Sequence, residues 1–364
     1  MRLIASEPCK SSMIETRAIA SANALARTVE SCHNAGVNLK DRTVLVTGAG
    51  GFIGSHLVEA LIAKGCQVRV FVRYTSTGRY GWIDSFRAEI RQQIKIIAGD
   101  LRDSDAVRDA VKGCDAVFHL GALIGIPYSY IHPREYVDTN IVGTTNVLVG
   151  CREHQVARVV QISTSEVYGT AQYVPIDEKH PQVGQSPYAA SKIAADMLAE
   201  SFYRSFGLPV TIIRPFNTYG PRQSQRAIIP TIIMQFLESE TIALGATSPT
   251  RDLTYVTDTV AGIIRGAEVD GVVGMTINLG SGTEISVSKL AEQIAVLLGR
   301  KLRIREDADR VRPEGSEVAR LVSNNSLAQQ VLLWRPLVPL GQGLRQTIDW
   351  FQANPSGIRS DYAV

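Results

Sequence analysis

The stretch TVLVTGAGGFIG, residues 43–54, joins a short run of β-branched and apolar residues to a glycine-rich turn. The run 43–46 is typical of a buried strand, and the residues from 54 onward have the apolar spacing of a helix. Within the turn, Gly48 permits a tight bend, Gly51 lets the backbone approach a pyrophosphate, and Gly54 lets helix and strand pack closely. The start of the helix adds amide donors and a positive dipole end. This strand–turn–helix arrangement predicts a dinucleotide site.

The composition narrows the class of protein. The 364 residues are 45% hydrophobic and 20% charged, with a net charge of +3, which is typical of a globular protein and gives no long basic run for nucleic acid. No apolar stretch approaches the roughly 18 residues that a membrane span needs. Five cysteines without paired spacing predict reduced thiols in a cytoplasmic protein. Six histidines in no ligand pattern predict no metal site.

The rhythm of the chain from residue 41 predicts the fold class. Continuous apolar strands alternate with helical stretches, which is typical of a parallel sheet covered on both faces. We therefore expect an α/β fold with a doubly wound parallel Rossmann sheet and ligands at the carboxyl ends of its strands. The expected strands are 43–46, 68–72, 94–98, 116–120, 158–162 and 210–213, and the expected helices are 54–64, 103–112, 135–153 and 188–206.

Four regions are expected along the chain. Residues 1–40 have helical apolar spacing and predict an N-terminal helical extension, and residues 41–215 form the dinucleotide-binding domain. Residues 216–350 are less regular and predict a smaller α/β substrate-binding lobe, part of which returns to the Rossmann domain. Residues 351–364 are expected to be a tail. In the lobe we expect helices at 227–239 and 286–299 and strands near 242–244, 276–278 and 302–304.

The end of the second expected strand indicates the type of dinucleotide. An acidic residue there would bind the ribose hydroxyls of NAD, whereas this chain has Arg73 followed by hydroxyl residues and Arg79. A guanidinium suits the 2′-phosphate of NADP, so NADP is favoured, with NAD as the alternative. Asp100 follows the third strand and is placed to meet the adenine. Other expected cofactor contacts are Phe52, Ile53, Leu101, Leu120 and Ala122.

Two segments carry the expected chemistry. Tyr188 and Lys192 lie four residues apart in a predicted helix, so their side chains share one face. The ammonium is expected to lower the tyrosine pKa, so that Tyr188 can remove a hydroxyl proton while hydride leaves the same carbon for nicotinamide. The fifth strand ends in Thr164, Ser165 and Glu166, which adds hydroxyls and a carboxylate at the mouth of the same site. A chance Tyr-Lys pair and a solvated turn glutamate are the structural alternatives.

Together with the segment RPFNTYGPR, residues 214–222, these motifs resemble the extended short-chain dehydrogenase/reductase family over residues 41–350. Within that family the chain looks most like the nucleotide-sugar 4,6-dehydratases. It resembles in particular the branch acting on nucleotide-linked N-acetylglucosamine in legionaminic-acid-type pathways. The segments that carry this likeness are HLGALI at 119–124, IPYSY at 126–130, STSEVY at 163–168, SPYAASK at 186–192 and PTRD at 249–252.

The resemblance implies a mechanism. Tyr188 takes the proton of the sugar 4-hydroxyl, Thr164 hydrogen-bonds that oxygen, and hydride passes from C4 to the nicotinamide. The new ketone acidifies the C5 proton, which Glu166 removes as general base, and water leaves from C6. Hydride then returns to C6. The cofactor is thus regenerated in each turnover and is expected to bind tightly, with Lys192 on its nicotinamide ribose.

One residue departs from the family pattern. Typical 4,6-dehydratases carry an Asp immediately before this glutamate, and it protonates the departing 6-hydroxyl, whereas this chain has Ser165. A serine is a poor acid, so water, Glu166 or Tyr188 must supply the proton. Thr-Ser-Glu also occurs in the decarboxylases that make UDP-xylose. Decarboxylation and 4-epimerisation therefore stay open, as does a non-enzymatic dinucleotide sensor or scaffold.

The diphosphate of a nucleotide sugar requires donors from the C-terminal lobe. Guanidinium groups match phosphate oxygens in pairs, and an amide can add a further donor. The expected substrate-binding residues are Asn217, Arg222, Arg251 and Arg312. The resemblance also implies a homodimer. The choice between UDP and GDP stays open.

Overall fold

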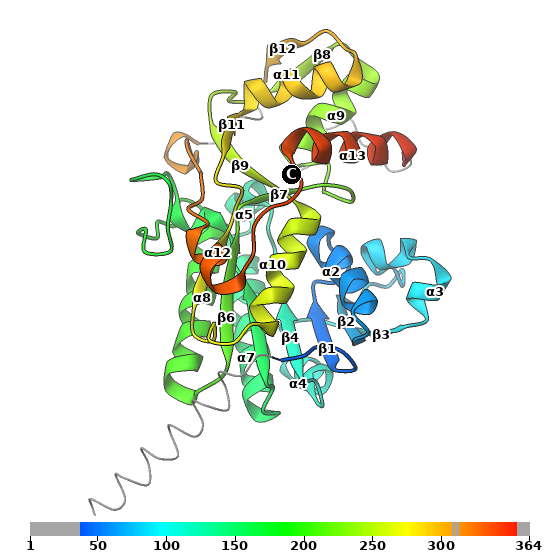
Figure 1. The fold of residues 1–364 in the computed structure, drawn as a ribbon, viewed down its shortest axis with the longest axis vertical. Coiled ribbons are helices and arrows are strands. Elements are labelled where there is room, and N and C mark those ends of the chain that lie inside the picture. Colours follow the sequence, from blue (N-terminus) through cyan, green and yellow to red (C-terminus); the bar gives the residue numbers. More distant parts are fainter. Residues whose placement is uncertain (1–36, 308–309, 311–312, 355–364) are drawn as a thin grey trace, which may run out of the picture.

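In the computed structural model, described for residues 37–307, 310 and 313–354, the core is a seven-stranded parallel sheet. Its strands follow the order β10-β6-β5-β4-β1-β2-β3 (Figure 1). Buried apolar side chains on both faces hold the sheet between two layers of helices. The bounds are β1 Thr43–Thr47, β2 Gln67–Arg73, β3 Ile94–Gly99, β4 Ala116–His119, β5 Arg158–Ile162, β6 Val210–Pro215 and β10 Thr276–Leu279.

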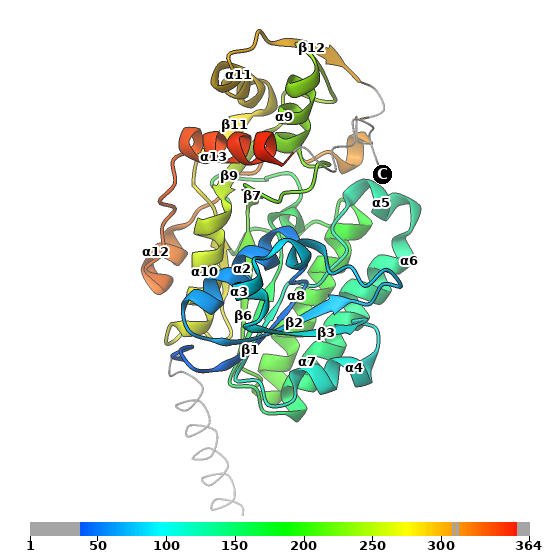
Figure 2. The same ribbon diagram turned by 90° about the vertical axis from the view of Figure 1, so that its right-hand side faces the viewer.

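Helices cover both faces of this sheet, which confirms the α/β doubly wound class (Figure 2). On one face, α2 packs against α10, and α10 in turn contacts β5 and β6. On the other face, α7 packs between α4 and α8. Short helices connect these layers. The bounds are α2 Phe52–Ala63, η1 Gly81–Ser85, α3 Ala88–Arg91, α4 Ser104–Val111, α5 Ile126–Ile131, α6 Pro133–Tyr136, α7 Gly143–Glu153, η3 Ser165–Tyr168, α8 Pro187–Phe206, α10 Val256–Glu268, η5 Glu314–Ser316 and α12 Ser326–Leu332.

A smaller lobe sits over the carboxyl ends of the strands. It contains a three-stranded sheet, β11-β9-β7, and a two-stranded sheet, β12-β8. Helices α9, α11 and α13 pack against one another beside these strands. The bounds are β7 Asn217–Tyr219, α9 Ile228–Glu238, β8 Thr241–Leu244, β9 Thr250–Tyr255, β11 Glu284–Ser286, α11 Val287–Leu298, β12 Arg303–Glu306 and α13 Leu340–Ala353.

Three expectations about elements need correction. The strand expected near 276–278 in the lobe is β10, which pairs with β6 as the edge strand of the main sheet. The helix expected over 135–153 is three segments, because the π-helical turn η2, Val137–Val142, separates α6 from α7. The fourth strand ends at His119, so Leu120 already belongs to the loop that follows. The expected helical extension falls almost entirely on residues 1–36, outside the described residues, as do residues 355–364 of the tail.

The helix that carries the Tyr-Lys pair has well-defined ends. At its start, Ser186 accepts a hydrogen bond from the amide of Ala189, and Pro187 occupies the first turn, where its missing amide costs nothing. At its end, Gly207 adopts a left-handed conformation. Within the described ranges, no helix has the length and apolar composition needed to cross a membrane.

Candidate active site

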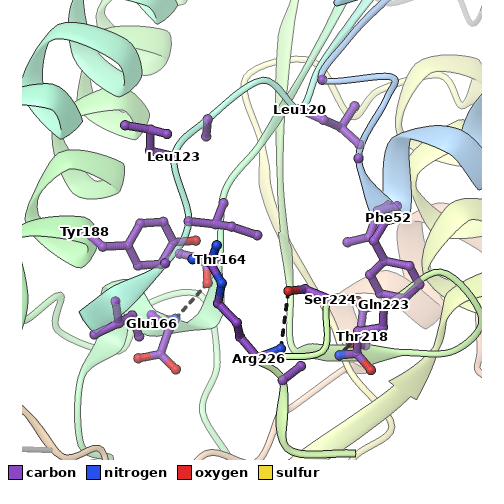
Figure 3. A pocket seen from close by; sticks show the side chains of 18 of the residues that line it. Phe52, Leu120, Leu123, Thr164, Glu166, Tyr188, Thr218, Gln223, Ser224 and Arg226 are labelled. Atoms are coloured by element: carbon purple, nitrogen blue, oxygen red, sulfur yellow. Dashed lines mark hydrogen bonds between the residues drawn. The ribbon is translucent and has the colours of Figure 1, made fainter. Parts of the chain in front are cut away.

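A cavity of about 1220 Å³ opens between the carboxyl ends of the main strands and the lobe. The glycine turn after β1 and the loops after β2, β3, β4 and β5 line one side of it. The segments around β7, β9 and the start of α9 line the other side (Figure 3). The position agrees with the rule that ligands of doubly wound sheets bind at this edge.

The glycine turn has the shape that a pyrophosphate requires. Gly48 has a φ of +69°, and a Cβ added to it would lie 2.8 Å from the amide nitrogen of Gly121. A Cβ on Gly54 would lie 2.3 Å from the carbonyl oxygen of Gly48, so helix α2 sits directly against the turn. At the start of α2, Gly51 provides no side-chain cap, which leaves the first amides directed at the cavity end of the helix. Phe52 and Ile53 line the cavity beside them. These features fit a dinucleotide.

Arginines surround the expected adenosine end of the cavity. Arg73, exposed at the end of β2, lines the cavity with Arg79. Asp100 also lines it, but its carboxylate is held by Arg102 through two hydrogen bonds of 2.9 and 2.7 Å from Nε and Nη2. This side-chain hydrogen bonding lowers the pKa of Asp100. Leu101 follows on the same loop. The end of β2 therefore presents positive charge rather than a free carboxylate.

The loop after β4 brings Leu120 and Ala122 to the cavity wall. Asn140, in the π-helical turn η2, holds this loop in place. Its Oδ1 accepts a 2.8 Å hydrogen bond from the amide of Leu123, and its Nδ2 donates to the carbonyl of Leu123 and to Ser191 Oγ, each at 2.9 Å. Asn140 thus ties the cavity loop to α8. A lone asparagine carries no sequence signal for this role, and the π turn that aims it is visible only in the structure.

Tyr188 and Lys192 reach the cavity from one face of α8, as their spacing predicts. The ammonium of Lys192 donates a 2.7 Å hydrogen bond to the carbonyl of Ile162, and burial lowers the pKa of Lys192 to about 8. Burial raises the pKa of Tyr188, while a hydrogen bond with Thr164 opposes the rise. The expected lowering of the tyrosine pKa is therefore wrong for this structure, because desolvation of the phenolate outweighs the nearby groups.

The turn after β5 presents its side chains to the same cavity. Thr164 caps the start of the 3-10 turn η3, and its Oγ1 accepts a 3.2 Å hydrogen bond from the amide of Glu166. Figure 3 shows Glu166 and Tyr188 on the same side of the cavity. Ser165 is buried and also lines the cavity. The structure thus brings Thr164, Ser165, Glu166, Tyr188 and Lys192 to one cavity.

Only two of the four residues expected to bind the substrate are found among the described residues that line the cavity. Asn217 and Arg251 line the cavity. Asn217 Nδ2 is buried without a hydrogen-bond partner among the described residues, as expected for a donor that meets a ligand. Arg251 donates to the carbonyl of Thr250 at 2.9 Å and to Glu317 at 3.1 Å.

Arg222 departs from its expected place. It has a φ of +67° and donates to both carboxylate oxygens of Glu59 on α2, at 2.7 and 3.0 Å. Among the described residues that line the cavity, Arg222 is absent, so it joins the lobe segment to α2 instead. Arg312 lies outside the described residues.

The sequence reasoning missed Arg226 and Tyr136. Arg226 precedes α9, lines the cavity, and its Nη1 lies 3.6 Å from where a Cβ on Gly125 would be. Figure 3 shows its side chain extending into the cavity from the lobe side. Tyr136 packs edge-on against Tyr188, with ring centroids 6.3 Å apart. The sequence signal for Arg226 was its place just after the segment 214–222. Within the part of the chain described here, no cluster of three His, Cys, Asp or Glu residues could hold a metal ion.

Comparisons with known proteins show the family of the chain. The family described as GDP-mannose 4,6 dehydratase matches residues 45–347. The dTDP-glucose 4,6-dehydratase of Streptomyces niveus is 32% identical over 319 residues, covering 85% of this chain and 93% of that protein. The structure of DesIV, a dTDP-glucose 4,6-dehydratase from Streptomyces venezuelae with NAD bound, superposes with a TM-score of 0.77 at 30% identity, covering 86% and 97% of the two chains. UDP-N-acetylglucosamine 4-epimerase from Methanobrevibacter ruminantium M1, in complex with UDP-N-acetylmuramic acid, also gives 0.77 at 30% identity, covering 86% and 99%.

Proposed function

The chain belongs to the GDP-mannose 4,6-dehydratase family of extended short-chain dehydrogenases/reductases, and from this membership we propose that it converts UDP- or GDP-N-acetylglucosamine to the 4-keto-6-deoxy sugar. Such an enzyme is a hydro-lyase that keeps its nicotinamide cofactor bound. The observation that carries it is the carboxylate of Glu166, which lines the same cavity as Tyr188, Thr164 and Lys192. A carboxylate at this position is the base that removal of a C5 proton requires.

The side chains divide the proposed reaction among them. Tyr188 accepts the proton of the sugar 4-hydroxyl, and Thr164 hydrogen-bonds the same oxygen. The glycine turn and Lys192 would hold a nicotinamide dinucleotide, which would supply the hydride acceptor for C4 and the hydride donor for C6. Between these transfers the 4-ketone acidifies the C5 proton, Glu166 removes it, and the C6 hydroxyl leaves as water. Glu166 finally returns a proton to C5, so the sugar has lost one water and the cofactor is unchanged.

Because Ser165 stands where typical 4,6-dehydratases have an aspartic acid, another group must protonate the departing hydroxyl. Ser165 is buried beside Glu166, and a serine hydroxyl stays protonated at neutral pH. We propose that the proton taken up by Tyr188 is delivered to the leaving hydroxyl, directly or through water. This assignment makes Tyr188 the group that both accepts and donates a proton within one turnover.

We propose NADP as the cofactor, with NAD as the alternative. Arg73 and Arg79 line the cavity at the end of β2, and the carboxylate of Asp100, which also lines the cavity, is paired with Arg102. A 2′-phosphate would meet two guanidinium groups at this end. Arg73→Gln should weaken binding of NADP at least tenfold and leave that of NAD unchanged, measured by isothermal titration calorimetry. Equal losses for both would exclude Arg73 as the group that binds the 2′-phosphate.

A 4-epimerase is the second candidate function. Epimerases are among the similar structures, and Ser165 replaces the acid expected of a dehydratase. An epimerase needs no base at C5, so the position of Glu166 favours dehydration. A decarboxylase like those that make UDP-xylose would need a 6-carboxyl sugar. By resemblance we also propose a homodimer, which light scattering after gel filtration tests.

In the deciding experiment, the purified protein is incubated with UDP- or GDP-N-acetylglucosamine, and the mass of the product is measured by mass spectrometry. Loss of one water supports the dehydratase, unchanged mass with inverted C4 establishes the epimerase, and loss of carbon dioxide from a uronic acid substrate establishes the decarboxylase. In heavy water, Glu166→Gln should slow exchange of the C5 proton by about 100-fold or more while cofactor binding is kept. Glu200→Gln, which alters a surface carboxylate paired with Arg204, is the matched control. Exchange at the normal rate in Glu166→Gln would remove Glu166 as the base.

A further inference from the structure

A buried ion pair lies directly behind the catalytic turn. Asp196 on α8 and Arg214 on β6 are 0% and 2% exposed, and Nε of Arg214 donates to Oδ2 of Asp196 at 3.0 Å. Neither residue is among the described residues that line the cavity. Burying two opposite charges is costly and does little for stability compared with apolar packing. The pair therefore calls for a role in the site.

The pair holds both ends of the catalytic turn. Ser163, the residue before Thr164, donates its hydroxyl to Asp196 Oδ2 at 2.7 Å. Tyr168 closes the 3-10 turn that contains Glu166, and its hydroxyl oxygen accepts a 3.0 Å hydrogen bond from Nη1 of Arg214. The guanidinium also lies over the ring of Tyr168, 5.1 Å from its centroid. One ion pair thus anchors the residues on either side of Thr164 and Glu166.

The same carboxylate acts on the charge of Lys192. Asp196 lies one helical turn after Lys192, and its Oδ1 has no hydrogen-bond partner among the described residues. Its negative charge raises the pKa of Lys192, against the larger lowering caused by burial. The other titratable or charged groups around this cluster are His119 from β4, Tyr188 from α8, Glu166 and Tyr168 from η3, Arg214 from β6, and Glu178. His119 is neutral above a pKa of about 3.

We propose that Asp196 and Arg214 are positioning residues: together they fix the turn that carries Thr164 and Glu166, and the carboxylate of Asp196, one helical turn after Lys192 on α8, supplies the opposite charge to its ammonium. The hydroxyls of Ser163 and Tyr168 transmit the first effect. The second acts through space, without any hydrogen bond between Asp196 and Lys192. Oxidation at C4 is common to the dehydratase, the epimerase and the decarboxylase, so the role does not depend on which of them the chain is.

The first test measures the charge effect without substrate. In protein labelled with isotopic lysine, the NMR signal of Lys192 is assigned by its loss in Lys192→Met and followed against pH. The signal of the unmodified protein should titrate near pH 8. In Asp196→Asn it should titrate at least about one pH unit lower, because a neighbouring opposite charge shifts a pKa by about 1–3 units. Glu200→Gln, which alters an exposed acid on the same helix, should leave the titration unchanged. A titration that does not move in Asp196→Asn overturns this part.

The second test addresses the turn and guards against variants that fail to fold. Asp196→Asn leaves Arg214 unpaired, so the double variant Asp196→Asn/Arg214→Gln serves in its place when the single one unfolds. Ser163→Ala and Tyr168→Phe each remove one hydroxyl and keep the ion pair. Both should speed amide hydrogen exchange in residues 163–169 and lower kcat about tenfold at unchanged KM, with the Lys192 titration unaltered. Unchanged amide hydrogen exchange and unchanged kcat in both Ser163→Ala and Tyr168→Phe would overturn the proposal that the ion pair fixes the turn.

The readouts separate this inference from the proposed function. The lysine titration and the hydrogen exchange need no nucleotide sugar, so an absence of turnover on every sugar offered would count against the proposed function alone. The four variants of the network are Asp196→Asn, Asp196→Asn/Arg214→Gln, Ser163→Ala and Tyr168→Phe. If they lost thermal stability while kcat and the Lys192 titration stayed unchanged, the ion pair would have a purely structural role and the inference would be overturned.

Discussion

Replacing Gly54 by alanine tests the cofactor site through a single methyl group. The added Cβ would lie 2.3 Å from the carbonyl oxygen of Gly48 and 2.9 Å from Cα of Ala49. Ordinary contacts need about 3.5 Å, so helix α2 and the turn must separate by about 1 Å. Both atoms belong to the backbone, so no side-chain rotation relieves the clash. The turn that holds the pyrophosphate must therefore move.

The expected size of the effect follows from that displacement. A shift of about 1 Å in a positioning group costs about 100-fold, so the Kd for the dinucleotide should rise about 100-fold. Overpacking should cost about 1–3 kcal/mol of stability, partly offset by about 1 kcal/mol because alanine favours helices over glycine. Isothermal titration calorimetry measures the Kd, and thermal unfolding measures the stability.

Gly341 offers the matched control for this change. It lies in the first turn of α13, and a Cβ there would meet nothing within 4 Å. Gly341→Ala should keep the Kd and raise the Tm slightly, since the same substitution now gains helix propensity without a clash. If Gly54→Ala bound the dinucleotide as tightly as the unmodified protein, the glycine turn would have no close contact to protect. The assignment of the pyrophosphate to this turn would then be wrong.

Three further predictions concern the reaction. Tyr188→Phe should bind cofactor and substrate but show no transient reduced-nicotinamide absorbance in stopped flow, and a normal transient would exclude Tyr188 as the proton acceptor. Asn217→Ala should raise KM at least about tenfold, because it removes a buried hydrogen-bond donor. Arg222→Gln should leave KM unchanged and lower the free energy of unfolding by about 1 kcal/mol. The reverse pattern in steady-state kinetics would show that Arg222, and not Asn217, binds the substrate. The rate of the first hydride transfer should fall as pH rises through about 8, because Lys192 then loses the proton and the positive charge with which it is proposed to hold the nicotinamide ribose. A rate constant that stays flat to high pH would contradict this role of Lys192.

Much of the fold follows from local pattern. The strands of the main sheet before the lobe are predominantly apolar runs between glycine or polar turns, so their bounds agree with expectation to within two residues. β10 was harder to place. Its four residues, Thr276–Leu279, alternate polar and apolar side chains and are as short as the lobe strands β8 and β12. Only the packing of α10 across β5 and β6 returns the chain to the main sheet beside β6.

The candidate site was predictable where spacing along one element decided it. Tyr188 and Lys192 share a helix face by their separation alone, and Glu166 follows a strand that ends at the ligand edge of the sheet. Arg222 could not be placed in this way. A positive φ at that residue and the carboxylate of Glu59, far away in sequence, turn it toward α2. Such choices depend on tertiary partners that no local pattern reveals.

The pKa of Tyr188 shows a second limit of sequence reasoning. Its distance in sequence from Lys192 suggested a stabilising charge, but the ammonium donates to the carbonyl of Ile162 and the phenol is buried. The cost of desolvating a phenolate depends on the surrounding atoms, which only the folded chain defines. The ion pair of Asp196 and Arg214 was not predicted either, because 18 residues separate its partners and only the folded chain brings them together.

The path of the chain between sheet and lobe has a consequence for engineering. The chain leaves the main sheet after β6, returns with α10 and β10, leaves again with β11 and α11, and comes back once more with α12 before α13. Exchanging the lobe with that of a relative would therefore need several simultaneous splices rather than one cut. A truncation after β6 would also remove the edge strand β10 from the sheet. The unpaired backbone groups of β6 would then form an exposed edge that is prone to aggregation. Altered specificity is thus best sought by exchanging cavity-facing side chains within an intact scaffold.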